Sequence, residues 1–242
     1  MKTFFTLIIF LFPFSILAKD FNLTLESGAL WQIRNDVRIP GNTGTLVSFD
    51  EYSSNPFIHY RIETSFKTGV RHGLRLIYAP LNISVNGEEK RQVNFNNQAF
   101  NANQPLSVDY TFNSYRVGYF YQLFGNDKSY FNIGITGKIR DAEITFSQNG
   151  TKASYDNLGF VPLFYYALRI SLQEGLFLYS DADFAVASQG RAIDATLKLK
   201  KNISSNSLVG FGLRVLEGGA DNDKVYTFSQ INYLVIDFSY LF

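Results

Sequence analysis

Residues 58 to 67 of the chain read Ile58-His-Tyr-Arg-Ile-Glu-Thr-Ser-Phe-Lys67, and this stretch decides the class of fold. Every second side chain is apolar or weakly polar, and the side chains between them are polar or charged. A period of two is typical of a β-strand, in which successive side chains point to opposite faces. Because one face carries full charges at Arg61, Glu63 and Lys67, the strand must separate an apolar environment from a charged one.

The same period recurs along nearly the whole chain. We therefore predict an all-β protein, and the pattern of its connections and faces favours an antiparallel transmembrane up-and-down β-barrel of ten strands. An even number of strands returns both ends of the chain to the same side. Eight or twelve strands remain alternatives, because the ends of predicted strands are uncertain by a few residues. The nine further strands are predicted at 23–34, 74–78, 115–123, 131–140, 164–171, 176–186, 193–199, 209–215 and 234–242.

The predicted connections alternate in length, apart from a short one at 188–190. Short turns and long loops at opposite ends are typical of outer-membrane barrels. Pro80 and Pro162, with slips of the alternation near Asn113 and Asp141, predict β-bulges near the rim that carries the long loops. The short turns are 68–70, 124–129, 173–175 and 202–206, and the long loops are 36–56, 82–105, 147–158 and 218–224.

The composition supports a membrane barrel and excludes several other classes. Of the 242 residues 46% are hydrophobic and 17% aromatic, yet the mean hydropathy is −0.05, so apolar and polar residues are interleaved. This disfavours a bundle of transmembrane helices. The absence of cysteine excludes a disulfide scaffold and a Cys-ligated metal. A formal charge of +1 gives no reason to bind nucleic acid. We expect no cofactor and no metal.

The first 18 residues are typical of a secretory signal peptide. Lys2 is followed by an apolar run from Phe4, and a small residue, Ala18, precedes Lys19-Asp20. We expect cleavage after Ala18, which leaves 19–242 as a single barrel domain exported to the outer membrane.

Alternation alone does not tell the inside of a barrel from the outside. The apolar faces hold more aromatic rings than a narrow barrel can enclose, so we expect these faces to contact lipid. A soluble secreted β-sandwich remains the alternative. The aromatic side chains predicted to face outward are Tyr60, Tyr78, Tyr110, Phe112, Tyr119, Tyr121, Tyr166, Phe184, Phe238 and Tyr240.

The chain ends with Ile236-Asp-Phe-Ser-Tyr-Leu-Phe242, an alternating strand. This strand resembles the C-terminal signal of Gram-negative outer-membrane barrel proteins, with Tyr240 two residues before the terminal Phe242. The resemblance implies that the barrel assembly machinery is a partner during biogenesis. It also implies a setting of outer-membrane lipid and lipopolysaccharide, in which we expect a monomer.

The opposite faces carry both signs of charge, and we predict that these side chains pair in the lumen, because unpaired buried charges are costly. The predicted function is an integral outer-membrane barrel with a charged, occluded lumen and a structural, adhesive or narrow-channel role. The predicted inward charges are Glu26, Arg34, Arg61, Glu63, Arg75, Asp109, Arg116, Lys138, Arg140, Arg169, Asp181, Asp183, Asp194, Lys198 and Arg214.

The alternative is a barrel enzyme at the extracellular rim. Of the two histidines, His59 falls on the polar face near the loop end, where Asp36, Asp141 or Asp183 are candidate partners. The omptin proteases are also ten-stranded barrels with Asp and His groups at that rim. This chain lacks a matching Asp-x-His pair, so the similarity concerns architecture alone and no omptin residue is carried over. A lipid A-modifying hydrolase would need a triad facing lipid.

Charges in the predicted long loops suggest a clamp that holds the first loop over the mouth of the barrel. We predict that Arg38 pairs with Glu217 or Asp221, and that Arg140 pairs with Asp36. Turn chemistry at the neighbouring glycines is compatible with this clamp.

Overall fold

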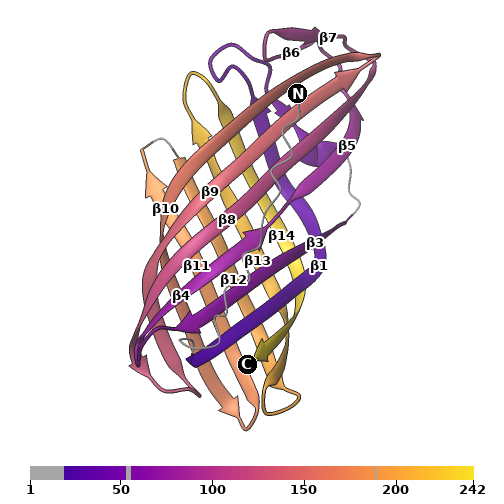
Figure 1. Ribbon diagram of the computed structural model, residues 1–242. Coiled ribbons are helices and arrows are strands. Elements are labelled where there is room, and N and C mark those ends of the chain that lie inside the picture. Colours follow the sequence, from indigo (N-terminus) through magenta and orange to yellow (C-terminus); the bar gives the residue numbers. More distant parts are fainter. Residues whose placement is uncertain (1–18, 53–55, 189) are drawn as a thin grey trace.

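The chain folds as a closed antiparallel β-barrel (Figure 1). The computed structural model describes residues 19–52, 56–188 and 190–242. The predicted signal peptide lies outside these residues. The strands are β1 (Lys19–Arg38), β2 (Val47–Ser48), β3 (Phe57–Lys67), β4 (His72–Ala79), β5 (Asn82–Glu88), β6 (Val93–Phe95), β7 (Gln98–Phe100), β8 (Pro105–Gly125), β9 (Tyr130–Gln148), β10 (Thr151–Gln173), β11 (Leu176–Ala187), β12 (Gly190–Asn202), β13 (Ser207–Asp221) and β14 (Tyr226–Leu241).

Ten strand positions make the wall of the barrel, as the alternation predicted. Each neighbouring pair is antiparallel, and β14 pairs with β1 to close the sheet. β4 and β5 share one position, because both pair with β8 and only Pro80 and Leu81 separate them. Proline has no N–H for the ladder, so the strand is interrupted there. The predicted all-β, ten-stranded barrel is confirmed.

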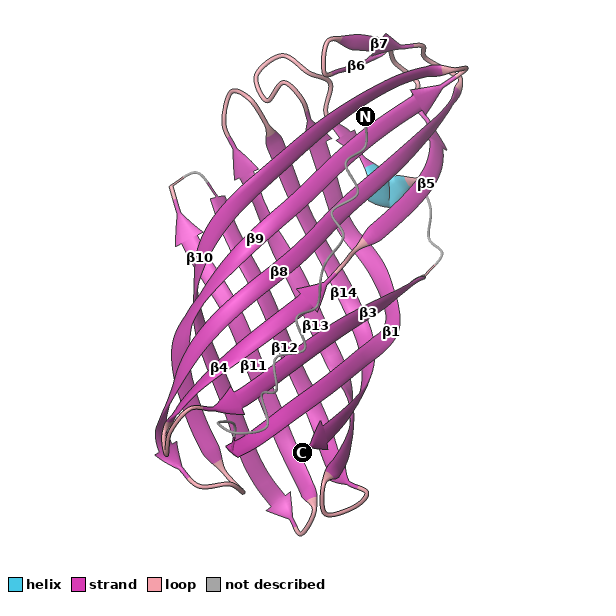
Figure 2. Cartoon of the chain, in the orientation of Figure 1, coloured by secondary structure: helices cyan, strands magenta, loops and turns pink. Residues whose placement is uncertain are grey.

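The two ends of the barrel differ in their connections (Figure 2). Turns at 68–71, 126–129, 174–175 and 203–206 join strands at one end, here called the short-turn end. The other, long-loop end carries β2, a 3-10 helix (Phe49–Glu51) and the β6–β7 hairpin. Within the described residues, no helix is long and apolar enough to cross a bilayer.

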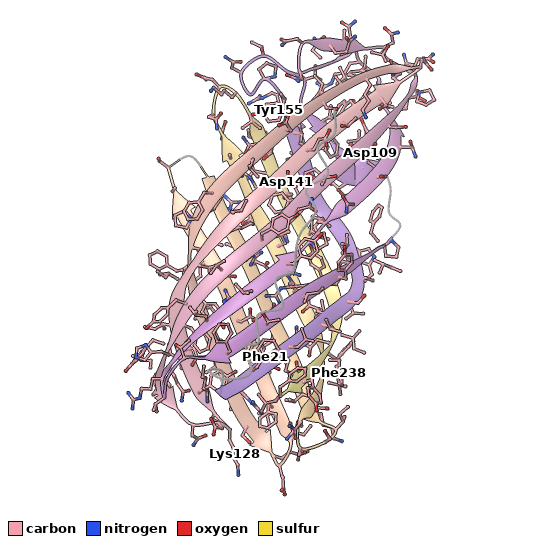
Figure 3. All side chains as sticks on the ribbon, in the orientation of Figure 1. Phe21, Asp109, Lys128, Asp141, Tyr155 and Phe238 are labelled. Carbon is pink, nitrogen blue, oxygen red and sulfur yellow. The ribbon has the colours of Figure 1, made fainter. Side chains whose placement is uncertain are left out.

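The outside of the barrel is apolar around its circumference. Ile58 is 86% exposed and Val186 is 80% exposed, and Leu76, Val117, Ile135, Leu213 and Ile236 also lie open on the outer face. Figure 3 locates Phe238 nearer the short-turn end than Asp109 and Asp141. Large apolar side chains open on every part of a closed sheet match a surface that contacts lipid, where closure leaves no backbone edge unpaired.

The prediction of a long loop at 147–158 is wrong, because β9 and β10 extend through this segment and are joined by a two-residue turn. β9 ends at Gln148 and β10 begins at Thr151. Asn149 and Gly150 both have positive φ, 49° and 82°. Asn-Gly is the favoured sequence for such a hairpin turn. The polar composition of this segment therefore reflects strands in water rather than an irregular loop.

No bulge occurs at the two predicted slips of the alternation. Asn113 and Asp141 lie directly opposite each other, and Pro162 pairs in register with Gly137. Instead, the apolar residues pass from the outer face of the sheet to its inner face, while the alternation of side-chain directions along each strand continues without a break. Val117 and Ile135 face outward, whereas Tyr110, Ile144 and Phe146, nearer the long-loop end, are buried inside. The predicted outward positions of Tyr110 and Phe112 are therefore wrong.

Candidate functional site in the barrel interior

Ion pairs cross the lumen near the middle of the barrel. The Glu26 carboxylate of β1 contacts Lys198 of β12 and lies 3.2 Å from the Arg214 guanidinium of β13. Lys198 also lies 2.7 Å from the Asp237 carboxylate, and Lys200 lies 3.1 Å from it. Since β1 and β12 are separated by two strands in the sheet, the contact between Glu26 and Lys198 spans the interior rather than following the wall.

A second group of ion pairs joins the opposite wall. Asp183 of β11 contacts Arg75 of β4 and lies 2.8 Å from Arg116 of β8. Asp194 lies 2.5 Å from Arg116 and accepts two hydrogen bonds from Arg214, at 2.6 and 2.7 Å. Arg214 thus links both groups. Arg61 lies 2.8 Å from Glu63 and 3.8 Å from Glu26, so it also joins them. We call the connected set the charge belt; it comprises Glu26, Arg61, Glu63, Arg75, Arg116, Asp183, Asp194, Lys198, Lys200, Arg214 and Asp237.

Most of the predicted inward charges lie in the interior, but not all of them join the belt. The Lys138 ammonium lies 4.6 Å from the centroid of the Phe112 ring. Arg140 donates to Asn157, and Arg169 stacks 3.6 Å from the Phe177 ring centroid. Asp181 is only 4% exposed. None of these four forms an ion pair within the described residues.

Two of the predicted inward charges lie outside. A register shift between Gln32 and Arg34 turns the Arg34 side chain outward, where it is 43% exposed and pairs with Asp36 at 2.5 Å. Asp109 is exposed because, in this part of β8, the apolar side chains point inward and the polar side chains point outward. Sequence reasoning also missed Asp237 and Lys200. Asp237 alternates with Ile236 and Phe238 on the last strand, and this alternation was the available signal.

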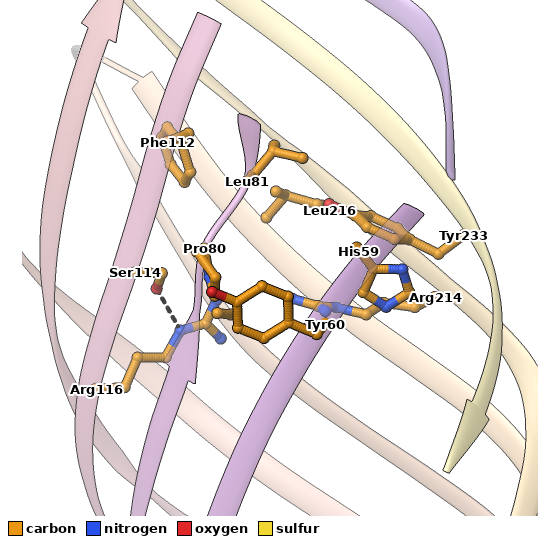
Figure 4. A pocket seen from close by; sticks show the side chains of 11 residues that line it. His59, Tyr60, Pro80, Leu81, Phe112, Ser114, Arg116, Arg214, Leu216 and Tyr233 are labelled. Carbon is orange, nitrogen blue, oxygen red and sulfur yellow. Dashed lines mark hydrogen bonds between the residues drawn. The ribbon is translucent and has the colours of Figure 1, made fainter. Parts of the chain in front are cut away.

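His59 lies inside the barrel, away from the rim. Its Nε2 is 3.4 Å from Glu26 Oε1, its Nδ1 is 3.2 Å from the Gly28 carbonyl oxygen, and its ring meets the Tyr233 ring edge to face. None of the three predicted acids contacts it in the part of the chain that the structure describes. Figure 4 shows His59 beside Arg214 in a crevice that also holds Pro80 and Phe112.

The predicted clamp pairs are replaced by other contacts. Glu217 pairs with Arg191 at 2.6 Å, and the Arg38 guanidinium lies 5.0 Å from the Tyr226 ring centroid. The first loop is held instead by burial and by Asp50, which accepts a hydrogen bond from the Asn35 N–H at 2.9 Å. Apolar anchoring therefore replaces the expected charge pairing, because the loop carries Val47 and Phe49 into the interior.

Apolar side chains from the wall and from the loops pack together in the interior at the long-loop end. Phe49 of the 3-10 helix packs edge-on against Phe146 of β9, with ring centroids 5.6 Å apart. Phe95 of β6 stacks on the same ring at 4.1 Å. We call this cluster the apolar core; it comprises Leu30, Val37, Ile39, Val47, Phe49, Leu81, Ile83, Val85, Val93, Phe95, Phe100, Leu106, Val108, Tyr110, Ile144, Phe146, Ile231, Tyr233 and Val235.

Tyr52 ties the first loop to the β5 wall. Its hydroxyl donates to Glu89 Oε1 at 2.9 Å, and burial together with Glu89 raises the pKa of this phenol. Its ring lies over Gly87, where an added Cβ would come 2.3 Å from the ring. Glycine at this position therefore makes room for the ring.

A cavity of about 410 Å³ lies below the charge belt, at the short-turn end. Its mouth includes Lys67, Asp127 and Asn202, which lie at or beside the short turns. Its wall also includes Asp181, Arg169 and the rings of Tyr130, Tyr165 and Tyr179. The interior thus has three levels: an apolar core, a charge belt and a polar cavity.

A closed antiparallel barrel with an apolar exterior and a charged interior is the architecture of the small outer-membrane β-barrels of Gram-negative bacteria. The class predicted from the terminal strand is confirmed. Short turns face the periplasm in such barrels, so we expect the short-turn end to be the periplasmic end.

Among known proteins, only solved structures gave matches to this chain. No family model matches the sequence, and no curated protein matches it significantly. Among solved structures, Ail of Yersinia pestis with the heparin analogue sucrose octasulfate has 11% identity and a TM-score of 0.43, over 93% of this chain and 100% of Ail. Neisserial surface protein A has 9% identity and a TM-score of 0.39, over 92% of this chain and 97% of that protein. The toluene transporter TodX of Pseudomonas putida has 9% identity and a TM-score of 0.37, over 93% of this chain and 90% of TodX. These values give no basis for transferring a function.

Proposed function

We propose that this protein is an outer-membrane barrel with an occluded lumen, and that it acts as a structural or adhesive component of the cell surface. The observation that carries the proposal is the apolar core, which fills the lumen at the extracellular end. Phe49 and Phe146 are fully buried there, although one comes from a loop and the other from the wall. A water-filled channel would be lined by polar side chains at this level.

The charge belt supports occlusion at a second level. Arg75 and Arg116 reach Asp183 from the opposite wall, and Lys198 joins Glu26 to Asp237. Breaking a buried pair by moving one partner leaves an uncompensated charge, at a cost of about 3–5 kcal/mol. Ions would therefore have to displace paired groups to pass.

The extracellular end has the features of a rigid platform. β8, β9 and β10 continue past the apolar band of the exterior, and the core ties them to the first loop and to the β6–β7 hairpin. On this outer surface, Ser84 donates to Asp109 at 2.6 Å, and Ser107 donates to Asn86 at 2.5 Å. Polar side chains thus face outward on a wall whose inner face is packed, which suits contact with a polar partner. His59 lies beneath the core, so we propose no catalytic role for it at the rim.

Planar-bilayer recording tests the occluded lumen. We expect the full-length barrel to insert without a discrete conductance step under conditions in which a general porin conducts. A matched variant, Phe49→Ser, opens the core but leaves the belt intact, and it should also fail to conduct. A steady single-channel conductance of the unaltered barrel would overturn the proposal.

Surface display tests the adhesive role. Cells of a non-adherent Gram-negative host that display the barrel should attach to a glycosaminoglycan-coated or protein-coated surface more than cells with an empty vector. Replacing 90–103, the β6–β7 region, by a short Gly-Ser linker should reduce attachment while heat-modifiable gel migration persists. Equal attachment of vector and barrel cells would contradict adhesion and leave a structural role.

A further inference from the structure

The periplasmic cavity holds a carboxylate that the protein leaves unpaired. Glu26, Asp183, Asp194 and Asp237 each contact a Lys or Arg within 4.0 Å. Asp181 has neither an ion pair nor a hydrogen bond among residues 19–52, 56–188 and 190–242, although it is 4% exposed and lines the cavity. A buried carboxyl group without a hydrogen-bonded protein partner needs water or a ligand to complete its hydrogen bonds.

A cation without a carboxylate partner lies on the same wall. Arg169 faces the cavity from β10, stacked on Phe177, and no carboxylate lies within 4.0 Å of it in the described part of the chain. Its Nε is buried without an acceptor, and the residue lines the cavity beside Tyr130. Arg169 is thus positioned to receive a carboxylate that the protein does not supply.

The strand register fixes how these two charges are related. Arg169 pairs with Tyr179, and Asp181 follows Tyr179 by two positions on β11. Both side chains therefore leave the same face of the sheet as diagonal neighbours, whose Cα atoms are about 7–8 Å apart. The stacking on Phe177 draws the guanidinium toward the mouth, because Phe177 lies on the mouth side of Tyr179. The separation suits a molecule with opposite charges at its two ends.

We propose that this cavity binds a small zwitterion, of the class of an amino acid or a short peptide. Asp181 would hold its ammonium group at the inner end, and Arg169 would hold its carboxylate toward the periplasm. Tyr130, Tyr165 and Tyr179 form a wall of rings beside it. A volume of about 410 Å³ lies within the range of small-molecule sites, about 300–1,000 Å³. The site does not depend on the occluded lumen, since it lies below the belt.

Calorimetric titration of the full-length barrel in detergent tests the proposal, with dialanine as the probe. We expect saturable binding that weakens at least tenfold for N-acetyl-dialanine, which lacks the ammonium group, and for dialanine amide, which lacks the carboxylate. In Asp181→Asn the acetylated and free peptides should bind alike. In Arg169→Gln the amide and the free peptide should bind alike. Asp109→Asn, at the other end of the barrel, is the matched control.

Each alternative outcome overturns the proposal. If no peptide binds saturably, the cavity is a water-filled vestibule. If N-acetyl-dialanine binds as dialanine does but dialanine amide does not, the cavity is a simple anion site. If both blocked peptides bind as dialanine does, the charges of Asp181 and Arg169 play no part in binding. Heat-modifiable migration of both variants shows that they are folded. Bilayer conductance would contradict the occluded lumen without affecting these titrations, so the two proposals fail separately.

Discussion

Asn113 of β8 and Asp141 of β9 lie directly opposite each other, at the level where the apolar residues of both strands change faces. Toward the periplasm, Val117 and Ile135 point out to lipid; toward the extracellular end, Val108 and Phe146 point into the core. The pair therefore marks the level at which the outer face of both strands changes from apolar to polar, and we expect the outer surface to pass from lipid to water there. The strands cross this level without a shift in their pairing register.

A charge on the outer face should be tolerated on one side of this boundary and not on the other. Val117→Lys introduces a cation on the lipid side and should cost up to about 2–4 kcal/mol, with the largest cost near the bilayer midplane. Asp109→Lys, on the same face of β8 but beyond Asn113, should change stability little. Equilibrium unfolding in urea with lipid vesicles compares the two variants. An equal loss in both would contradict the boundary.

The apolar core should stabilise the extracellular end more than the membrane wall. Phe146→Ala removes a fully buried ring that contacts Phe49, Phe95 and Phe100, and a change of this kind costs about 3–5 kcal/mol. Because the lost contacts lie beyond the membrane, we expect faster proteolysis of the first loop and of the β6–β7 hairpin. Heat-modifiable migration should persist. Phe164→Ala, on the exposed outer face, is the control and should leave loop proteolysis unchanged.

How much of this interior follows from the sequence depends on the range of the interaction. Alternation predicted the strands and the inward direction of Glu26, Arg61 and Asp183, because a pleat fixes the direction of each side chain locally. It did not predict which charges meet. Arg75 and Asp183 are 108 positions apart, and their contact depends on closure of the barrel and on the stagger of ten strands, neither of which a single strand encodes.

The apolar core was missed for a different reason. Val93, Phe95 and Phe100 stand in a polar segment with no sustained period, and such a segment predicts a loop. The slips of the alternation at Asn113 and Asp141 are visible in the sequence, where they predict bulges. An inversion of faces gives the same local pattern as a bulge; the two differ only in whether the pairing register shifts. The Asn149-Gly150 turn was the local signal that the strands continued.

The charge belt should be sensitive to loss of a single carboxylate. Asp183→Asn leaves Arg75 and Arg116 without their shared anion, and breaking a buried pair in this way costs about 3–5 kcal/mol. We expect a lower urea midpoint for unfolding from vesicles. In a second variant, Asp183→Asn combined with Arg75→Met, one stranded cation is removed, so part of the loss should return. No recovery in the double variant would show that the pairing is not the source of stability.

Tyr52 should make the first loop sensitive to alkaline pH. Its phenol is partly buried and donates to Glu89, and both raise its pKa in the folded loop. When the loop detaches, the phenol ionises near its ordinary pKa of about 10. At a pH between this ordinary pKa and the raised pKa of the docked loop, the docked phenol retains a proton that the detached phenol has lost. The stability of the docked loop therefore falls as the pH rises above about 10. Tyr52→Phe removes this proton and its hydrogen bond. The variant should therefore dock less firmly at pH 8, by about 0.5–1.5 kcal/mol, but lose less on going to pH 11. Proteolysis of the loop in the detergent-solubilised barrel at the two pH values measures both effects, and a parallel pH response of wild type and variant would exclude Tyr52 as the titrating group.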